Sequence, residues 1–227
     1  MLSAQELAIV ALSLKVSAVA IFGVTPLAFG VAWVLARGRH AGLVVLDAVV
    51  HLPLVLPPVV VGWLLLLAFG AQGPVGRWLA DWGITLMFRW TGAALASAVM
   101  AFPLMVRAMR LSIEAVDRRL EQAARTLGAS RWRVFASVTL PLAMPGVLAG
   151  LVLGFARSLG EFGATITFVS NIPDETQTLP LAIYAALQTP SGDALVTRLA
   201  LISVALSLAA LVVSEILARR MGQRHGF

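Results

Sequence analysis

The sequence predicts an all-α membrane protein, a polytopic helical bundle with about five transmembrane helices. Hydrophobic residues make up 59% of its 227 residues and charged residues only 12%, whereas a soluble domain carries about 25% charged residues. Several apolar runs reach or approach the length of about 20 residues that spans a bilayer. Basic residues gather at the ends of these runs, which is typical of cytoplasmic loops. Segments 37–40, 107–133 and 219–224 hold 12 of the 17 Lys and Arg residues.

The composition also excludes several functions. The chain has no cysteine, which excludes thiol catalysis, cysteine-bound metals and disulfides. Its three histidines, at 40, 51 and 225, lack the spacing of metal ligands. The only lysine, Lys15, is followed by Val16, so the phosphate-binding loop of a Walker-type ATPase is absent. We therefore expect no catalytic residue, metal site or cofactor in this chain. The position of the basic residues at span ends argues against nucleic-acid binding.

Five spans are expected within one domain that covers residues 9–218. They lie at about 9–36, 43–69, 92–106, 141–168 and 199–218. An N-terminus outside and a C-terminus inside then place all three basic segments in the cytoplasm. The Trp-rich segment 70–91 and the polar segment 170–197 lie outside, each with room for a short helix. A sixth crossing, made from 78–91 or by splitting the second span at its prolines, is the alternative, but it disturbs this charge balance.

The second span contains a proline-rich break. Asp47 and His51 lie four residues apart near its start and can form a hydrogen bond on one helix face. Pro53, Pro57 and Pro58 follow, and prolines at this density break or kink a membrane helix. Such breaks are tolerated inside a bundle or beside a water-filled cavity. His51, Pro57 and Pro58 are therefore candidates for lining a transport path, and a kink that serves only packing is the alternative.

The fourth span combines small residues with two charges. Gly146, Gly150 and Gly154 are spaced by four residues and form a ridge that permits close helix contact. Arg157 and Glu161 follow at positions i and i+4, and charges inside a membrane are candidates for function. In an anion path, Arg157 would supply positive potential while Glu161 would limit tight trapping. The alternative is a structural ion pair that fixes helix packing.

Between the third and fourth spans lies a polar stretch from Arg107 to Arg133, with seven arginines and three acidic residues. The Ala-rich run up to Leu127 favours a helix. Gly128 is a natural residue to end it because glycine tolerates a positive φ. Ser130 can then cap a second short helix that runs through Phe135.

This predicted helix–turn–helix carries apolar residues at Leu120, Leu127, Trp132 and Phe135. A two-helix connector with an apolar face is suited to docking in the groove of a partner protein. The alternative is an amphipathic loop that rests on lipid headgroups, with its arginines facing phosphates.

The same stretch resembles the "EAA" loop of binding-protein-dependent ABC importer permeases, in which Glu-Ala-Ala, Gly and Ile-x-Leu-Pro recur at fixed spacing. The pattern falls here on Gln122-Ala123-Ala124, Gly128, Val138, Leu140 and Pro141, with every spacing kept. Gln122 stands where the family has Glu, with Glu121 one place earlier, and Val138 stands where it has Ile. The resemblance implies a type I ABC importer transmembrane domain. Its coupling loop, 107–137 here, would sit in a groove of an ATPase subunit through Glu121, Gln122, Ala123, Ala124, Gly128, Trp132, Leu140 and Pro141.

Residues 51–62, 155–165 and 168–180 extend the resemblance to the molybdate-transport permeases and their sulfate and thiosulfate relatives. The last of these stretches looks more like the molybdate group. The resemblance implies a pore-forming subunit, not an enzyme, that moves molybdate or tungstate across the bacterial inner membrane. Sulfate, thiosulfate or another oxyanion is the alternative cargo.

The resemblance also implies partners. They are a dimer of ATPase subunits that carry ATP and Mg, and a periplasmic oxyanion-binding protein. Because no internal repeat is visible, we expect a second copy of the chain, with the path on the two-fold axis. A secondary transporter is the remaining alternative from another class, since Asp47, His51, Arg157 and Glu161 are ionisable groups within spans. The spacing of the coupling loop argues against it.

Overall fold

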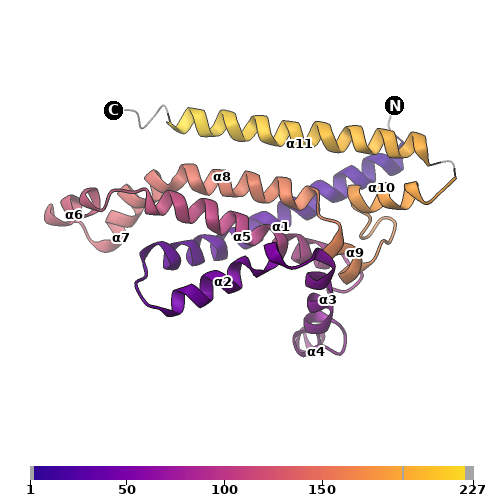
Figure 1. Cartoon of the computed structure of the whole chain (residues 1–227), viewed down its shortest axis with the longest axis horizontal. Coiled ribbons are helices and arrows are strands. Elements are labelled where there is room, and N and C mark those ends of the chain that lie inside the picture. The colour runs from indigo at the N-terminus through magenta and orange to yellow at the C-terminus, as the bar shows by residue number, and fades with distance from the viewer. Residues whose placement is uncertain (1–2, 191, 223–227) are drawn as a thin grey trace.

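The computed structural model describes residues 3–190 and 192–222, without the side chains of 214, 215 and 217–222. This part of the chain is an elongated bundle of helices (Figure 1). Four helical segments in it are long and apolar enough to cross a membrane, and one sharply bent helix pair makes a fifth if it counts as one span. The predicted all-α bundle of about five spans is therefore confirmed. The four long helices are α1 (Ala4–Arg37), α5 (Trp90–Glu114), α8 (Leu140–Leu159) and α11 (Asp193–Gly222).

The second span, expected over 43–69 with a proline-rich break, consists of two helices. α2 (Gly42–Val55) and α3 (Pro58–Phe69) meet at an angle of 115°. Pro57 precedes α3 with an extended backbone, and Pro58 occupies its first turn, where a missing N–H costs no hydrogen bond. The predicted break is therefore real, and it turns α3 and the short α4 (Pro74–Asp81) away from the bundle (Figure 1).

The fourth span also ends earlier than expected. A helix begins with α7 (Arg131–Val134), passes through a π-helical turn η1 (Phe135–Thr139) and continues as α8 (Leu140–Leu159). The chain then breaks at Gly160 and resumes as α9 (Gly163–Val169), so the expected continuous span over 141–168 is wrong. The third span is longer than expected, because α5 continues to Glu114 and takes in the first residues of the polar stretch.

The core lies between α1, α5 and α8, where small residues let the helix backbones approach. A Cβ atom at Gly154 would lie 2.8 Å from the Met105 side chain, and one at Gly150 would lie 3.2 Å from the Met105 carbonyl oxygen. A Cβ atom at Gly146 would collide with Ser112. The glycine ridge expected in the fourth span is therefore the contact surface of α8 with α5.

The end of the bundle that holds the start of α1 is fastened by polar contacts. The Ser3 hydroxyl accepts a hydrogen bond from the Glu6 backbone N–H at 3.2 Å, and the Glu6 carboxylate accepts one from the Ser3 N–H at 2.6 Å. This capping box satisfies N–H groups that have no partner within the helix. Glu6 also pairs with Arg198 of α11 at 2.7 Å, so the first and last long helices are joined at this end.

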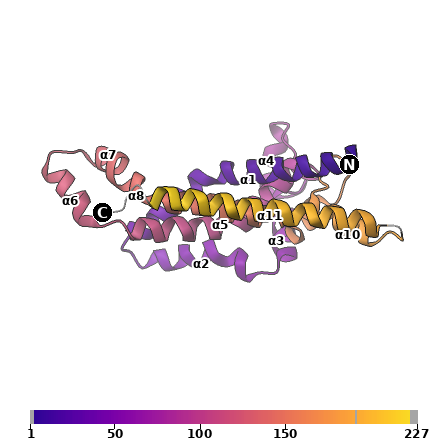
Figure 2. The same cartoon turned by 90° about the horizontal axis from the view of Figure 1, so that it is seen from above.

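The two helical ends of the described chain lie at opposite ends of the bundle. α1 begins at the end that holds α10 (Leu179–Leu187), and α11 finishes toward the end from which α6 (Arg118–Thr126) and α7 project (Figures 1 and 2). The segment expected over 170–197 contains α10, and its last residues already belong to α11.

Candidate coupling surface and transport path

The polar stretch folds as the helix, glycine turn and second helix that its sequence predicts. Asp117 caps α6 by accepting a hydrogen bond from the Arg119 N–H at 2.8 Å. Gly128 follows the helix with φ of +86°, a conformation that glycine adopts without strain. Ser130 caps α7 by accepting a hydrogen bond from the Arg133 N–H at 3.3 Å. The stretch therefore projects from the bundle as a folded unit rather than as an irregular loop.

The apolar residues of this unit are unevenly covered. Leu127 is 89% exposed and Trp132 is 75% exposed. Leu120 is also exposed, whereas Phe135 is partly buried against Trp33 of α1, with ring centroids 5.1 Å apart. Large exposed apolar side chains beside arginines form a surface that fits a partner protein.

Glu121 and Gln122 differ in their burial and in their contacts. The Glu121 carboxylate faces the bundle, where it pairs with Arg37 at the end of α1 at 2.6 Å. It also accepts a hydrogen bond from the Thr139 hydroxyl at 2.7 Å, just before α8. Gln122 is exposed. Glu121 therefore ties α6 to two membrane helices, and Gln122 is the residue of the pair that is open to a partner.

The other predicted coupling residues lie on both sides of this junction. Ala123 is exposed and Ala124 is partly buried on α6. Leu140 and Pro141 are partly buried in the first turn of α8, directly after the π-helical turn. The sequence does not identify Arg37 and Thr139 as anchors. A basic residue such as Arg37 at the end of a span is explained by topology alone, and Thr139 lies at the variable position of the loop pattern.

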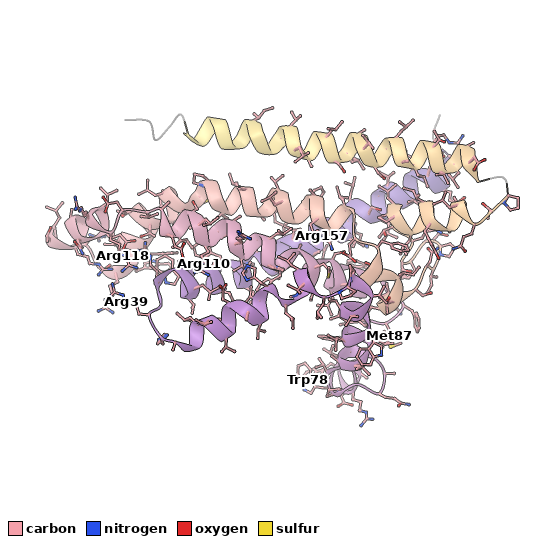
Figure 3. The ribbon with its side chains drawn as sticks, in the orientation of Figure 1. Arg39, Trp78, Met87, Arg110, Arg118 and Arg157 are labelled. Carbon is pink, nitrogen blue, oxygen red and sulfur yellow. The ribbon has the colours of Figure 1, made fainter. Side chains whose placement is uncertain are left out.

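The first group of path candidates is an ionic cluster between α2 and α5. His51 Nδ1 lies 2.9 Å from the Asp47 carbonyl oxygen and 3.3 Å from its carboxylate. Arg110 of α5 pairs with Asp47 at 3.0 Å and with Glu114 at 2.8 Å. The expected contact between Asp47 and His51 is present, and Arg110 was missed because nothing in the sequence brings α5 beside α2. Arg107 lines the same cleft, and Figure 3 shows Arg110 on the α5 side of it.

The second group lies where the two helix breaks pack together. A Cβ atom at Gly163 would lie 2.7 Å from the Pro58 side chain, and one at Gly62 would lie 2.6 Å from the Ala164 carbonyl oxygen. Pro58 therefore lies against the break between α8 and α9, and Pro57 precedes it in the chain. The contact needs glycine on both elements, which explains why both segments combine helix breakers with small residues.

Arg157 and Glu161 form the expected ion pair, with 2.7 Å between them. The Glu161 side chain is 1% exposed and that of Arg157 is 27% exposed. Glu161 also accepts a hydrogen bond from the Ala164 N–H at 2.8 Å and so caps α9. The carboxylate thus holds the geometry of the break, while the guanidinium remains open on one side. Figure 3 shows Arg157 about halfway along the bundle.

These two groups remain separate. Among the residues that the structure describes, no hydrogen bond or ion pair joins the His51 cluster to the Arg157 pair. The same residues contain no group of three His, Asp or Glu side chains placed to hold a metal ion. In both groups, carboxylates lie within ion-pair distance of arginines, so that opposite charges offset one another.

Comparison with known proteins shows similarity along nearly the whole chain, beyond the loop pattern at Gln122–Pro141. The molybdenum transport system permease protein ModB of Escherichia coli (strain K12) is 59% identical, over 96% of this chain and 95% of that protein. ModB of Haemophilus influenzae is 57% identical, over 98% of this chain and 97% of that protein.

The fold also has a match among solved structures. A bacterial ABC transporter involved in the import of the acidic polysaccharide alginate superimposes with a TM-score of 0.76 at 19% identity, over 96% of this chain and 80% of that one. At this identity the likeness shows the fold alone. The family model of the binding-protein-dependent transport system inner membrane component matches residues 25–223. The chain therefore belongs to the family of inner membrane components of binding-protein-dependent transport systems.

Proposed function

We propose that this chain is the membrane permease subunit of an ATP-driven importer that carries molybdate across the bacterial inner membrane. The observation that carries the proposal is the similarity to molybdenum permeases at 59% identity over 96% of the chain. The exposed helix–turn–helix would supply the surface that docks on an ATPase, and the two packed helix breaks would line the transport path.

Energy for transport comes from a separate ATPase subunit in this proposal. The chain has no phosphate-binding loop of its own. ATP and Mg would bind to the ATPase, whose groove would receive α6 through Gln122 and Leu127. A displacement of α6 would reach α1 and α8 through Glu121, because its carboxylate contacts Arg37 and Thr139. Differential contact with the ATPase can then bias a bundle that has two arrangements.

Orientation and cargo delivery follow from the same assignment. The basic end of the bundle, with α6, α7 and the end of α11, lies in the cytoplasm. The start of α1 and α10 lies outside, where a periplasmic oxyanion-binding protein would deliver the anion. Arg107, Arg110 and Arg157 would offer positive potential along the way, and their acidic partners would keep the anion from being trapped.

The path itself forms between two copies of the chain in this proposal. α2 buries only Val50 among its residues and leaves Val45, Val49 and Val55 exposed beside the Asp47–His51 cluster. A second copy on a two-fold axis would cover this face. Because the chain has no cysteine, a Val49→Cys variant reports the contact cleanly. Disulfide-linked dimers are expected for Val49→Cys and not for Val204→Cys on α11, which is similarly exposed; the reverse pattern would place the interface elsewhere.

Uptake in cells tests the proposed cargo. Cells that lack their own molybdate importer would express this chain with its ATPase and its binding protein. The proposal predicts ATP-dependent uptake of labelled molybdate that excess unlabelled molybdate suppresses and equal sulfate does not. Uptake that sulfate suppresses as well as molybdate would keep the importer and overturn the cargo. A chain with Gly128→Val serves as the control for uptake that is not coupled to the ATPase.

A further inference from the structure

Two clefts adjoin where α1 meets the projecting helices α6 and α7. The first is polar and is lined by four arginines, Arg37, Arg118, Arg125 and Arg131, and by Glu121. Arg37 and Glu121 neutralise each other at 2.6 Å. Among the residues that the structure describes, no carboxylate lies within ion-pair distance of the other three arginines. Within the described part of the chain, the cleft therefore has an excess of about three positive charges.

The second cleft is an apolar groove that continues from the first. Its walls are Phe29, Gly30 and Trp33 of α1 together with Trp132 and Phe135, and Arg131 lies at its rim. The rings form a connected cluster: the centroids of Phe29 and Phe135 are 6.1 Å apart, and those of Trp132 and Phe135 are 5.3 Å apart. Trp33, Arg131 and Phe135 line both clefts, so the polar cleft and the apolar groove share one boundary.

We propose that these two clefts together bind one anionic glycerophospholipid. The phosphate would lie among Arg118, Arg125 and Arg131, and an acyl chain would lie in the aromatic groove along α1. Trp33 sits at the boundary between them, the position that tryptophan prefers at the membrane–water interface. Basic pockets at the cytoplasmic end of membrane helices bind acidic headgroups in this way. The assignment to the cytoplasmic leaflet rests on the orientation proposed above.

The position of the groove identifies its occupant as a lipid. Gly30 is exposed on a membrane-spanning helix, and a Cβ atom added there would have no neighbour within 4 Å. A soluble ATPase would reach α6 but not this groove, which extends from the helix end toward the middle of α1. A free oxyanion would occupy the polar cleft and leave the apolar groove unfilled. A lipid fills both and would fasten α7 to α1 beside the Glu121 junction.

Lipid retention by the full-length protein tests the proposal directly. The protein, in complex with its co-expressed ATPase, would be exchanged into nanodiscs with equal amounts of phosphatidylglycerol and phosphatidylethanolamine. Native mass spectrometry after release would count the lipids retained. Wild type is expected to retain phosphatidylglycerol preferentially. Arg131→Gln should reduce this retention about fivefold, the effect of one arginine on an anionic headgroup. Gly30→Leu should reduce it comparably by filling the groove, and leucine is the better helix former.

Two matched controls separate the site from general effects. Arg133→Gln removes an exposed arginine from the same short helix that does not line either cleft. Gly23→Leu fills open space on α1 one heptad before Gly30, outside the groove. Both should retain phosphatidylglycerol as wild type does. Equal retention of the two lipids, equal losses in the controls, or displacement of the lipid by millimolar inorganic phosphate alone would overturn the proposal. None of these readouts depends on the identity of the cargo.

Discussion

Glu121 lies one position before the place where the importer family has its glutamate, and its contacts give that shift a physical meaning. Its carboxylate reaches inward to Arg37 and Thr139, so Glu121 holds α6 against the bundle. Gln122 takes the exposed position. A residue pattern can predict that this helix meets a partner, but it cannot tell which of two adjacent side chains faces the bundle.

A change at Glu121 tests whether α6 transmits force through this junction. Glu121→Gln removes the charge that pairs with the partly buried Arg37, at a cost of about 1–3 kcal/mol. We expect ATP hydrolysis by the complex to persist while transport falls, because the helix still docks but no longer moves α1 and α8. Asp81→Asn is the control, because Asp81 is exposed at the end of α4 and forms no ion pair among the residues that the structure describes. Equal loss of transport in both variants would show that the junction has no special role.

Gly128 tests the turn between α6 and α7. Its φ is +86°, and an added Cβ atom would meet nothing within 4 Å, so backbone strain alone decides the effect of a substitution. Gly128→Val should disturb the turn at a cost of about 1–3 kcal/mol and abolish coupled uptake while the protein still inserts. Gly128→Asn should retain most uptake, because asparagine tolerates this conformation. Normal uptake by the valine variant would contradict the coupling role.

The Arg157–Glu161 pair distinguishes a path element from a structural one. Arg157→Ala leaves the buried Glu161 carboxylate without its partner, which costs about 3–5 kcal/mol and should lower the melting temperature in detergent. If the double variant Arg157→Ala/Glu161→Ala regains stability but not transport, the arginine acts in the path. Full recovery of transport would make the pair purely structural.

At the scale of the elements, the two broken spans act as one unit because their breaks pack against each other. Gly163→Ala would press a methyl group against Pro58, at a distance of 2.7 Å. We expect it to destabilise the contact of α3 with α9 by about 1–3 kcal/mol and to reduce transport. Gly160→Ala is the matched control, because the nearest atom to its Cβ lies at 3.9 Å. The measurement is the melting temperature of each variant, which should be lower for Gly163→Ala than for Gly160→Ala. Equal melting temperatures would show that the two helix breaks do not depend on this contact.

The sequence predicted the helices and their breaks better than it predicted the contacts between them. Pro57 and Pro58 predict a break, because proline cannot continue a helix. The bend of 115° does not follow from them, since α9 sets it by packing against Gly62. The turn at Gly128 was predictable because the chemistry of a helix end is local. The junction of Arg37, Glu121 and Thr139 was not, because it joins residues that are distant in the sequence.

At the scale of the whole molecule, most of the basic residues lie in the segments at one end of the bundle. The positive-inside rule predicts that the two ends of the chain lie on opposite sides of the membrane. In the described chain, α1 begins and α11 finishes at opposite ends of the bundle (Figure 1). The choice of cargo cannot be derived from these charges, because molybdate and sulfate carry the same charge and shape. It rests on similarity along the whole chain to molybdenum permeases.

The most direct test is ATP hydrolysis by the complete transporter in lipid. The permease would be co-purified with its ATPase, reconstituted, and assayed with binding protein that is empty, loaded with molybdate or loaded with sulfate. The proposed function predicts stimulation by the molybdate-loaded protein alone. Stimulation by the sulfate-loaded protein would overturn the cargo and keep the class of transporter. Failure to form a stable complex with any ATPase would contradict the proposed mechanism as a whole.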